Sequence, residues 1–340
     1  MELIRRIAPE AIPLITIRYD IMQKLRFSQP LGRRTLARRL DLGERIVRRE
    51  LDLLRRQGLV EIHREGVCLT ETGMELLHPL GELVHGLKGL DALEKALARA
   101  LNLRKMIIVP GDSDESPVVK QALARATSNY LAGALSDDDI LAVTGGTTLA
   151  EVARSLPDVP FRRRVTVVPA RGGLGEEVEL QANTIAATIA RHLGGSYRLF
   201  HIPDDLPREA IDTICSEPKI RQIMDLLQRA DYVLHGIGTA EEMAKRRGLD
   251  REQMAVLRER RAVGEAFGYY FDQRGRIVYS TSSAGLRLED LPRVGEVIAV
   301  SGGRSKAQAT LAVLSTHYQD VCITDEGAAR LMWSLLGMEG

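Results

Sequence analysis

Five short apolar runs that end in glycine-rich turns constrain the fold of this chain more than any other feature. Each is rich in Val, Ile, Leu or Ala and is followed by a helix-forming stretch. They occupy residues 106–111, 140–146, 165–173, 232–238 and 297–303. Apolar strands that alternate with helices predict a parallel sheet covered on both faces, a Rossmann-like, doubly wound α/β domain. Ligands of such domains bind beyond the carboxyl ends of the strands, where these glycines lie.

Two of these turns have the composition of anion-binding loops. Residues 144–148 (Thr-Gly-Gly-Thr-Thr) and 301–306 (Ser-Gly-Gly-Arg-Ser-Lys) each follow a strand and open a helix. Free backbone N–H groups and the helix dipole favour a phosphate there, assisted by Thr147 and Thr148 in one loop and Lys306 in the other. Two such loops predict a doubly phosphorylated ligand. Neither loop matches the glycine pattern of a dinucleotide or nucleoside triphosphate site.

Three further polar residues are candidates for the same site. Arg171 follows a third strand, where a bidentate phosphate contact is feasible, although it can instead pair with Glu176 or Glu177. Arg246, in the pair Arg246-Arg247, is a candidate second phosphate ligand, and Glu265 is a candidate acceptor for a sugar hydroxyl.

Two other polar segments are expected to be structural. His235 ends an apolar run, where a histidine more often has a structural than a catalytic role. Thr324 or Asp325 is expected to cap a helix, because either side chain accepts from free N–H groups at a helix start.

The N-terminal residues predict a different module, a winged helix-turn-helix. Apolar residues recur at helical spacing over residues 16–28, 33–40 and 44–57, and a three-residue turn at 41–43 joins the last two helices. Residues 59–64 and 67–69 flank Glu65 and Gly66, a pattern typical of a β-hairpin.

Charge supports double-stranded DNA as the partner of this module. Residues 16–64 hold thirteen Lys or Arg against six Asp or Glu, although the whole chain carries only +1. Arg45, Arg48 and Arg49 are the candidates for base contacts. The candidates for phosphate contacts are Arg33, Arg34, Arg38, Arg39, His63 and Arg64. An aromatic content of 4% disfavours single-stranded nucleic acid, and a protein-interaction module is the alternative.

We divide the chain into a DNA-binding domain (1–74), a helical linker (75–103) and an effector domain (104–340). The linker has an apolar seam that either packs on its own domain or pairs with a second subunit. Because such DNA-binding proteins usually contact two half-sites, the second possibility is favoured. The three cysteines lie far apart, so no metal site is expected and the thiols should be reduced and buried. A cytoplasmic location is expected, because no signal or membrane segment is evident.

The ordered motifs of the chain resemble those of the SorC family of transcriptional repressors, in particular its regulators of central glycolytic genes. The segments that carry the resemblance are 30–36, 111–117, 143–148, 168–176, 181–185, 233–238, 265–271 and 324–329. It implies an effector domain similar to sugar-phosphate isomerases and glucosamine-phosphate deaminases, with fructose 1,6-bisphosphate as inducer and no cofactor. It also implies a repressed glycolytic operon and homodimers that associate as tetramers. Carried over by position, the effector-binding residues are Gly145, Gly146, Thr147, Thr148, Arg171, Gln181, Arg246, Glu265 and Lys306.

Two other functions are compatible with the sequence. A sugar-phosphate isomerase or deaminase with an appended DNA module would need a general base, for which Glu265 is the candidate. An activator of the same fold is not distinguished by sequence, because the position of the operator decides the sign of regulation.

Overall fold

The chain forms two compact units. The computed structural model describes residues 2–156, 164–173, 177–203 and 207–338. One unit comprises Met1–Leu93 with Ser116–Val118, and the other comprises Glu94–Glu115 with Val119–Gly340.

The N-terminal unit is a winged helix. Its elements are α1 (Glu2–Ile7), α2 (Ala11–Ser28), α3 (Arg33–Arg39), α4 (Glu44–Arg56), β1 (Val60–Ile62), β2 (Val67–Leu69) and α5 (Glu71–Leu87). Ile21, Leu36 and Leu51 bring one apolar face of each of the three central helices into a common core. The predicted helix-turn-helix and hairpin are therefore confirmed. Helix α2 starts at Ala11, earlier than predicted, because Pro13 falls in its first turn, where proline is tolerated.

The predicted linker seam lies on two helices, α5 and α6 (Leu90–Ala100). Leu77 is buried in the core of the N-terminal unit, whereas its neighbour Leu76 is 41% exposed. The seam is thus divided between the chain's own core and solvent.

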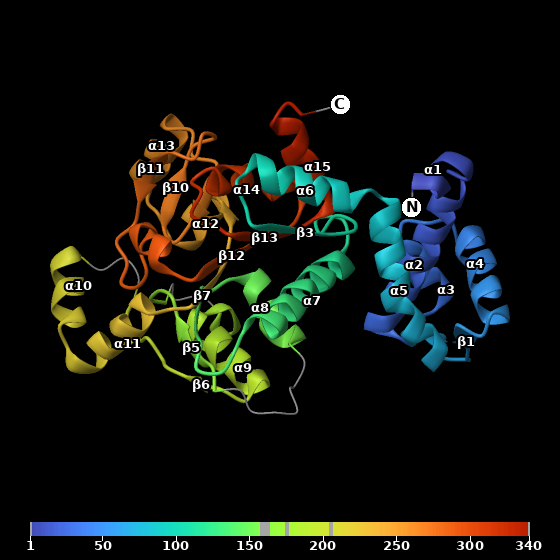
Figure 1. Cartoon of the computed structure of the whole chain (residues 1–340), viewed down its shortest axis with the longest axis horizontal. Coiled ribbons are helices and arrows are strands. Elements are labelled where there is room, and N and C mark those ends of the chain that lie inside the picture. Colours follow the sequence, from blue (N-terminus) through green and yellow to red (C-terminus); the bar gives the residue numbers. More distant parts are fainter. Residues whose placement is uncertain (1, 157–163, 174–176, 204–206, 339–340) are drawn as a thin grey trace. The chain divides into compact units, whose positions relative to one another are not determined.

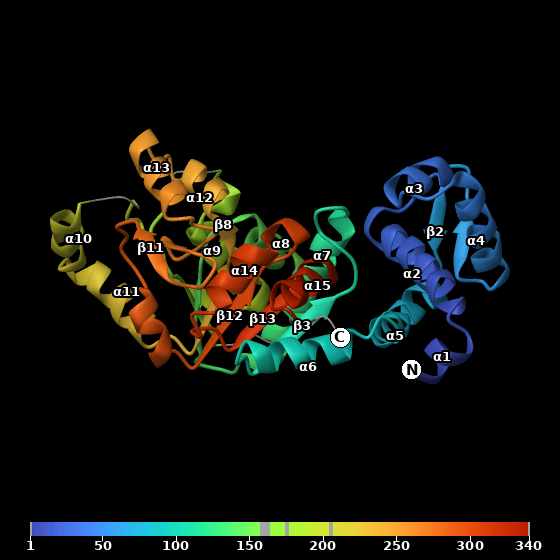
Figure 2. The same cartoon turned by 90° about the horizontal axis from the view of Figure 1, so that it is seen from above.

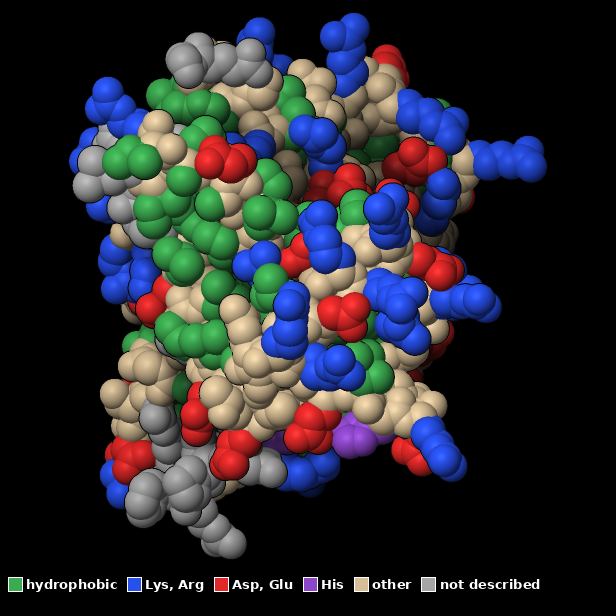
Figure 3. All heavy atoms as spheres, turned by 90° about the vertical axis from the view of Figure 1, so that its right-hand side faces the viewer, with side chains coloured by type: hydrophobic (Ala, Val, Ile, Leu, Met, Phe, Trp, Pro, Cys, Tyr) green, Lys and Arg blue, Asp and Glu red, His purple; other side chains and the backbone are tan. Residues whose placement is uncertain are grey.

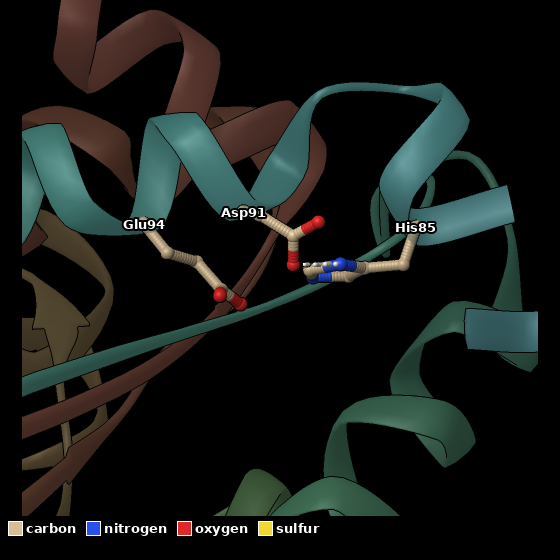
Figure 4. A group of neighbouring side chains, drawn as sticks. All are labelled: His85, Asp91 and Glu94. Carbon is tan, nitrogen blue, oxygen red and sulfur yellow. Dashed lines mark ion pairs between the residues drawn. The ribbon is translucent and has the colours of Figure 1, made fainter. Parts of the chain in front are cut away.

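Polar side chains of the linker have local partners (Figure 4). Within the N-terminal unit, His85 Nδ1 lies 3.1 Å from an Asp91 oxygen. Within the larger unit, the Glu94 carboxylate accepts the backbone N–H of Ile108 at 2.7 Å. Both contacts are thus local structural interactions of the linker helices.

A seven-stranded parallel sheet forms the centre of the larger unit. Its order is β3-β13-β12-β7-β4-β5-β6. The strands are β3 (Lys105–Val109), β4 (Ile140–Val143), β5 (Thr166–Pro169), β6 (Ser196–Tyr197), β7 (Tyr232–Gly236), β12 (Glu296–Val300) and β13 (Val321–Asp325). The five predicted strands are present, and β6 and β13 are additional. The α/β fold class is confirmed.

Helices cover both faces of this sheet (Figure 1). On one face, α7 (Pro117–Ala134), α8 (Thr147–Ser155) and α9 (Ala182–Leu193) pack in the main apolar core. Helices α14 (Ala307–Leu314) and α15 (Glu326–Leu335) lie on the other face. Two more helices, α10 (Arg208–Cys215) and α11 (Pro218–Gln228), lie in the sequence between β6 and β7.

A second sheet, which is antiparallel, is formed by the segment between β7 and β12. It has the order β11-β10-β9-β8. Its strands are β8 (Gly238–Thr239), β9 (Gly264–Ala266), β10 (Tyr269–Phe271) and β11 (Ile277–Ser280). Helices α12 (Ala240–Arg246) and α13 (Arg251–Glu259) share a small apolar core with it. Figure 2 shows α12 and α13 next to each other.

The strand order of the main sheet reverses between β7 and β4. From β4 the chain adds β5 and β6 in one direction, and from β7 it adds β12 and β13 in the other. Loops at such a reversal diverge and leave a crevice at the carboxyl ends of the strands, which is where doubly wound proteins bind ligands.

Candidate functional sites

A pocket of about 840 Å³, partly open to solvent, lies at this crevice. Loops after β4, β5 and β7 line it, together with α12 and the β9–β10 turn. All nine residues predicted for the effector site line it: Gly145, Gly146, Thr147, Thr148, Arg171, Gln181, Arg246, Glu265 and Lys306. The structure thus brings together residues that are up to 161 positions apart in sequence, Gly145 and Lys306.

The loop of residues 144–148 is shaped to present the start of α8 to the pocket. Gly146 has φ +118° and donates its N–H to the Leu180 carbonyl at 2.9 Å. A Cβ on Gly145 would lie 2.7 Å from that same oxygen, so the close approach requires glycine. Helix α8 begins at Thr147, and the N–H groups of a first helical turn have no partners within the helix. The turn therefore offers donors and a favourable dipole to an anion.

A buried carboxylate between two arginines forms another wall of the pocket. Glu265 Oε1 accepts the Gly268 N–H at 2.5 Å and lies 3.1 Å from Arg247 Nη2 and 4.0 Å from Arg171 Nη1. The three charged side chains are 4–6% exposed. Arg171 Nε also donates to Ser283 Oγ at 3.0 Å.

The sequence also offers Glu176 and Glu177 as partners of Arg171. Glu176 lies outside the described residues, as do the other two residues of 174–176. Glu177 is described and exposed, and Arg171 instead lies beside Glu265. The buried carboxylate is thus the acidic neighbour of Arg171 in the described structure.

Phe267 is among the pocket residues that sequence reasoning missed. Arg247, which the sequence offered only in the pair Arg246-Arg247, lines the pocket as well. Phe267 and Gly268 form the two-residue turn between β9 and β10, with φ +54° and +78°. Positive φ at both positions is typical of a type I′ hairpin, and it is rare for an aromatic residue.

The turn places the Phe267 ring beside His235. The two ring centroids are 4.7 Å apart. His235 is fully buried, its Nδ1 lies 3.1 Å from the Gly236 carbonyl, and its Nε2 has no hydrogen-bond partner among the described residues. Burial lowers the pKa of His235 to about 4. The histidine is therefore a neutral packing residue near neutral pH, and not a cation for a phosphate.

The loop of residues 301–306 differs from its predicted role. Lys306 lines the pocket, but the N–H groups of Gly303, Arg304 and Ser305 donate to carboxylates of this chain, at 2.6, 3.2 and 2.7 Å. The acceptors are Asp325, Asp112 and Asp114, respectively. These three N–H groups are therefore not available as a second phosphate site, and that part of the prediction is wrong.

The predicted cap at the start of α15 is confirmed. The Asp325 side chain accepts the N–H of Ala328 at 2.9 Å. Its other carboxylate oxygen is the one that binds Gly303.

A basic surface covers the helix-turn-helix and the wing. All the predicted DNA-binding residues, on α3, on α4 and in the wing, are exposed: Arg33, Arg34, Arg38, Arg39, Arg45, Arg48, Arg49, His63 and Arg64. Figure 3 shows many Lys and Arg side chains that project into solvent on the face it draws. Gly43 precedes α4 with an extended backbone, so the helix starts directly after the turn. The geometry is that of a recognition helix with a free outer face.

A buried ion pair fixes this recognition helix. Glu50, 1% exposed, lies 2.8 Å from Arg18 of α2 and 2.8 Å from Arg49. Burial acts to raise the pKa of Glu50, but hydrogen bonds from the two arginines outweigh it, so the pKa is lowered. Arg49 thus has an acidic partner on its own helix, unlike the neighbouring Arg48, for which the structure gives no ion pair among the described residues.

Two further sequence expectations concern cysteines and membranes. Cys322 is buried, whereas Cys68 and Cys215 are partly exposed, which corrects the expectation that all three are buried. Among the described residues, the structure contains no helix with the length and apolar character needed to span a bilayer.

Comparison with known proteins matches two consecutive parts of the chain to two domain families. Residues 14–84 match the family "CggR N-terminal DNA binding domain", and residues 85–334 match the family "Putative sugar-binding domain". The central glycolytic genes regulator of Bacillus subtilis (strain 168) is 41% identical over 326 residues, 96% of each chain. That of Priestia megaterium (strain DSM 319 / IMG 1521) is 43% identical over 331 residues, 97% of each chain.

Solved structures agree with this result. A SorC family transcriptional regulator from Enterococcus faecalis is 37% identical, with a TM-score of 0.66, over 71% of this chain and 99% of that one. The full-length sorbitol operon regulator SorC from Klebsiella pneumoniae, 21% identical, has a TM-score of 0.66 over 94% of this chain and 98% of that one, and shows the likeness of fold alone.

Proposed function

Because the chain belongs to the SorC family, as a homologue of the central glycolytic genes regulators, we propose that it represses a glycolytic operon and that a phosphorylated sugar releases it. That it is a transcriptional regulator with a sugar-binding domain, and not an enzyme, follows from the family. The isomerase or deaminase alternative is set aside on that ground.

Fructose 1,6-bisphosphate is the proposed effector. The observation that supports it is the distribution of groups in the pocket: the first turn of α8 with Thr147 and Thr148 at one place, and Lys306 on another loop. These are two separate positions for anionic groups, and the polar wall formed by Glu265 lies in the same pocket. A carboxylate accepts hydrogen bonds from hydroxyl groups, which suits a sugar between two phosphates.

Calorimetric titration of the full chain tests the effector. We expect fructose 1,6-bisphosphate to bind more tightly than fructose 6-phosphate, glucose 6-phosphate or dihydroxyacetone phosphate. Thr147→Val and Lys306→Met should each reduce this preference, because each removes a group from one of the two anion positions. Equal affinity for the bisphosphate and the monophosphates would contradict the proposal.

Release from DNA is the second part of the proposal. The winged helix is proposed to bind double-stranded operator DNA as a homodimer, and homodimers to associate as tetramers. A coupling free energy of about 1–3 kcal/mol would lower operator affinity roughly 5- to 150-fold when the effector binds. Fluorescence anisotropy with operator DNA measures this change, and sedimentation velocity with and without the effector measures the oligomer. An affinity for DNA that the effector leaves unchanged would contradict the regulatory role, and one that it increases would favour an activator.

A further inference from the structure

The loop that carries Lys306 is held by carboxylates from two distant parts of the sequence. We propose that Asp112 and Asp114 are positioning residues for the effector site: they fix the backbone of residues 303–305 and thereby hold Lys306 in the pocket. This inference rests on the proposed function for the ligand, but its structural part can be tested without one.

The contacts form a continuous carboxylate network of Asp112, Asp114 and Asp325. Asp114 accepts both the N–H and the hydroxyl of Ser305, at 2.7 and 3.0 Å. Asp112 Oδ1 accepts the N–H of Arg304 at 3.2 Å and that of Asp114 at 2.9 Å. Two consecutive backbone donors directly before Lys306 are therefore fixed by a loop that is about 190 residues away in sequence.

Buried Asp325 binds both loops, the one that contains Gly303 and the one that contains Ser113. Its Oδ2 accepts the Gly303 N–H at 2.6 Å, the Ser113 N–H at 2.9 Å and the Ser113 hydroxyl at 2.6 Å. Asp325 is completely buried at the end of β13, so this anchor belongs to the sheet. A buried carboxylate that accepts several donors has little freedom to move, because each lost contact would leave a buried charge with fewer partners.

Close packing excludes larger side chains between these loops. A Cβ on Gly303 would lie 2.3 Å from an Asp114 oxygen, and one on Gly327 would lie 2.2 Å from an Asp112 oxygen. The start of the same loop is fixed as well, because the Gly111 N–H donates to Glu326 at 3.0 Å. A side chain at position 303 or 327 would therefore displace Asp114 or Asp112.

The network explains why Lys306 acts alone on its loop. An anion at the N–H groups of residues 303–305 would have to displace Asp112 and Asp114. With those carboxylates in place, the loop offers the pocket its lysine and not its backbone. Asp112 and Asp114 are not among the pocket-lining residues, so any effect they have on the ligand is transmitted through the loop.

A double-mutant cycle tests this transmission in the full chain. Asp114→Ala should weaken binding of fructose 1,6-bisphosphate about tenfold or more, because it removes two hydrogen bonds to a charged acceptor. In a Lys306→Met background the same change should have almost no effect, since the group it positions is gone. Equal losses in both backgrounds would overturn the proposal, as would an Asp114→Ala variant with wild-type affinity.

Two further variants separate positioning from charge and general damage. Asp112→Asn keeps an acceptor at Oδ1 and should bind the bisphosphate almost like the wild type, whereas Asp112→Ala should not. Glu115→Gln is the matched control, because it removes a charge from the same loop and, among the described residues, its exposed carboxylate forms no hydrogen bond or ion pair with residues 303–305. A loss with Glu115→Gln as large as with Asp114→Ala would overturn the proposal.

Amide hydrogen exchange gives a readout that needs no ligand. In the wild type the amides of Gly303, Arg304 and Ser305 should be protected, and Asp114→Ala should speed exchange of Ser305. If the wild type binds no sugar phosphate, the proposed effector fails, and this measurement alone then decides whether the carboxylates hold the loop. Unchanged exchange in the variant would overturn the inference even if the effector is correct.

Discussion

The carboxylate of Glu265 is buried with Arg171 and Arg247, so it is sensitive to the loss of either partner. Arg247→Ala should lower the free energy of unfolding by about 3–5 kcal/mol, because it leaves a buried charge with one fewer compensating group. Urea denaturation followed by circular dichroism measures the loss. Adding Glu265→Gln should not restore it, because buried Arg171 would then lose its acidic neighbour as well. An Arg247→Ala variant as stable as the wild type would show that the ion pair is unimportant.

His235 predicts a pH dependence of stability. Its pKa is about 4 in the folded chain, against 6.5 for an ordinary histidine, because burial disfavours the cation. The unfolded chain therefore binds more protons between these two values. The contribution of neutral His235 is complete above about pH 6.5 and is lost as the pH falls toward 4, up to about 3 kcal/mol.

The measurement for His235 is a comparison of unfolding free energies at several pH values for the wild type and His235→Gln. Other carboxylates titrate in the same range, so only the difference between the two proteins reports on the histidine. That difference should change steadily from pH 6.5 to 4. A constant difference would contradict the lowered pKa.

Most individual residues of the candidate site could be proposed from the sequence, but not the partners with which they form hydrogen bonds and ion pairs. Gly145, Arg171 and Lys306 could be proposed because each follows an apolar strand, and strand ends converge in a doubly wound sheet. The role of the Ser305 N–H could not be foreseen, because its partner Asp114 lies 191 residues earlier. The pairing of Arg247 with Glu265 could not be foreseen for a similar reason, since the two are brought close only by the second sheet.

Among the elements, the turn between β9 and β10 allows a test of the pocket wall that Glu265 forms with Arg171. Gly268 has φ +78°, and a Cβ there would lie 2.4 Å from a guanidinium nitrogen of Arg171. Gly268→Ala should therefore weaken effector binding as well as stability. Gly248→Ala is the matched control, because that glycine has φ +65° with nothing within 4 Å of the added atom.

The control should show the cost of the left-handed backbone alone, about 1–2 kcal/mol. Gly268→Ala should cost more, because it adds the displacement of Arg171. Thermal unfolding and calorimetric titration of both variants provide the comparison. Equal costs in stability, with effector affinity intact in both, would contradict the proposed role of this turn.

Prediction of elements succeeded where a segment carries its own periodicity. The winged helix and five strands of the main sheet have clear apolar patterns bounded by glycine or polar turns. The strands β8 and β6 have only two residues each, too few for a periodic pattern. Strand β13 was overlooked because its polar end, Thr324 and Asp325, resembles a helix cap, and Asp325 in fact ends the strand and caps α15.

For the whole molecule, the proposed DNA binding should depend on salt in a way that separates two kinds of arginine. Arg33→Ala should weaken binding to all duplex sequences alike and reduce the salt slope by about one, because it removes a proposed phosphate contact. Arg48→Ala should instead reduce the preference for operator over random DNA. Anisotropy titrations at several salt concentrations measure both. The assignment of contacts fails if Arg33→Ala changes the sequence preference and Arg48→Ala does not.

The position of β7 between β4 and β12 has a consequence for ligand selection. The chain turns toward α8 after β4 and toward Lys306 after β12, so these two turns begin two strand spacings apart, about 10 Å. A rigid sheet fixes that separation. If the proposed effector site is correct, molecules should therefore be discriminated by the length between their charged ends, and a short or singly charged metabolite should satisfy only one end at a time.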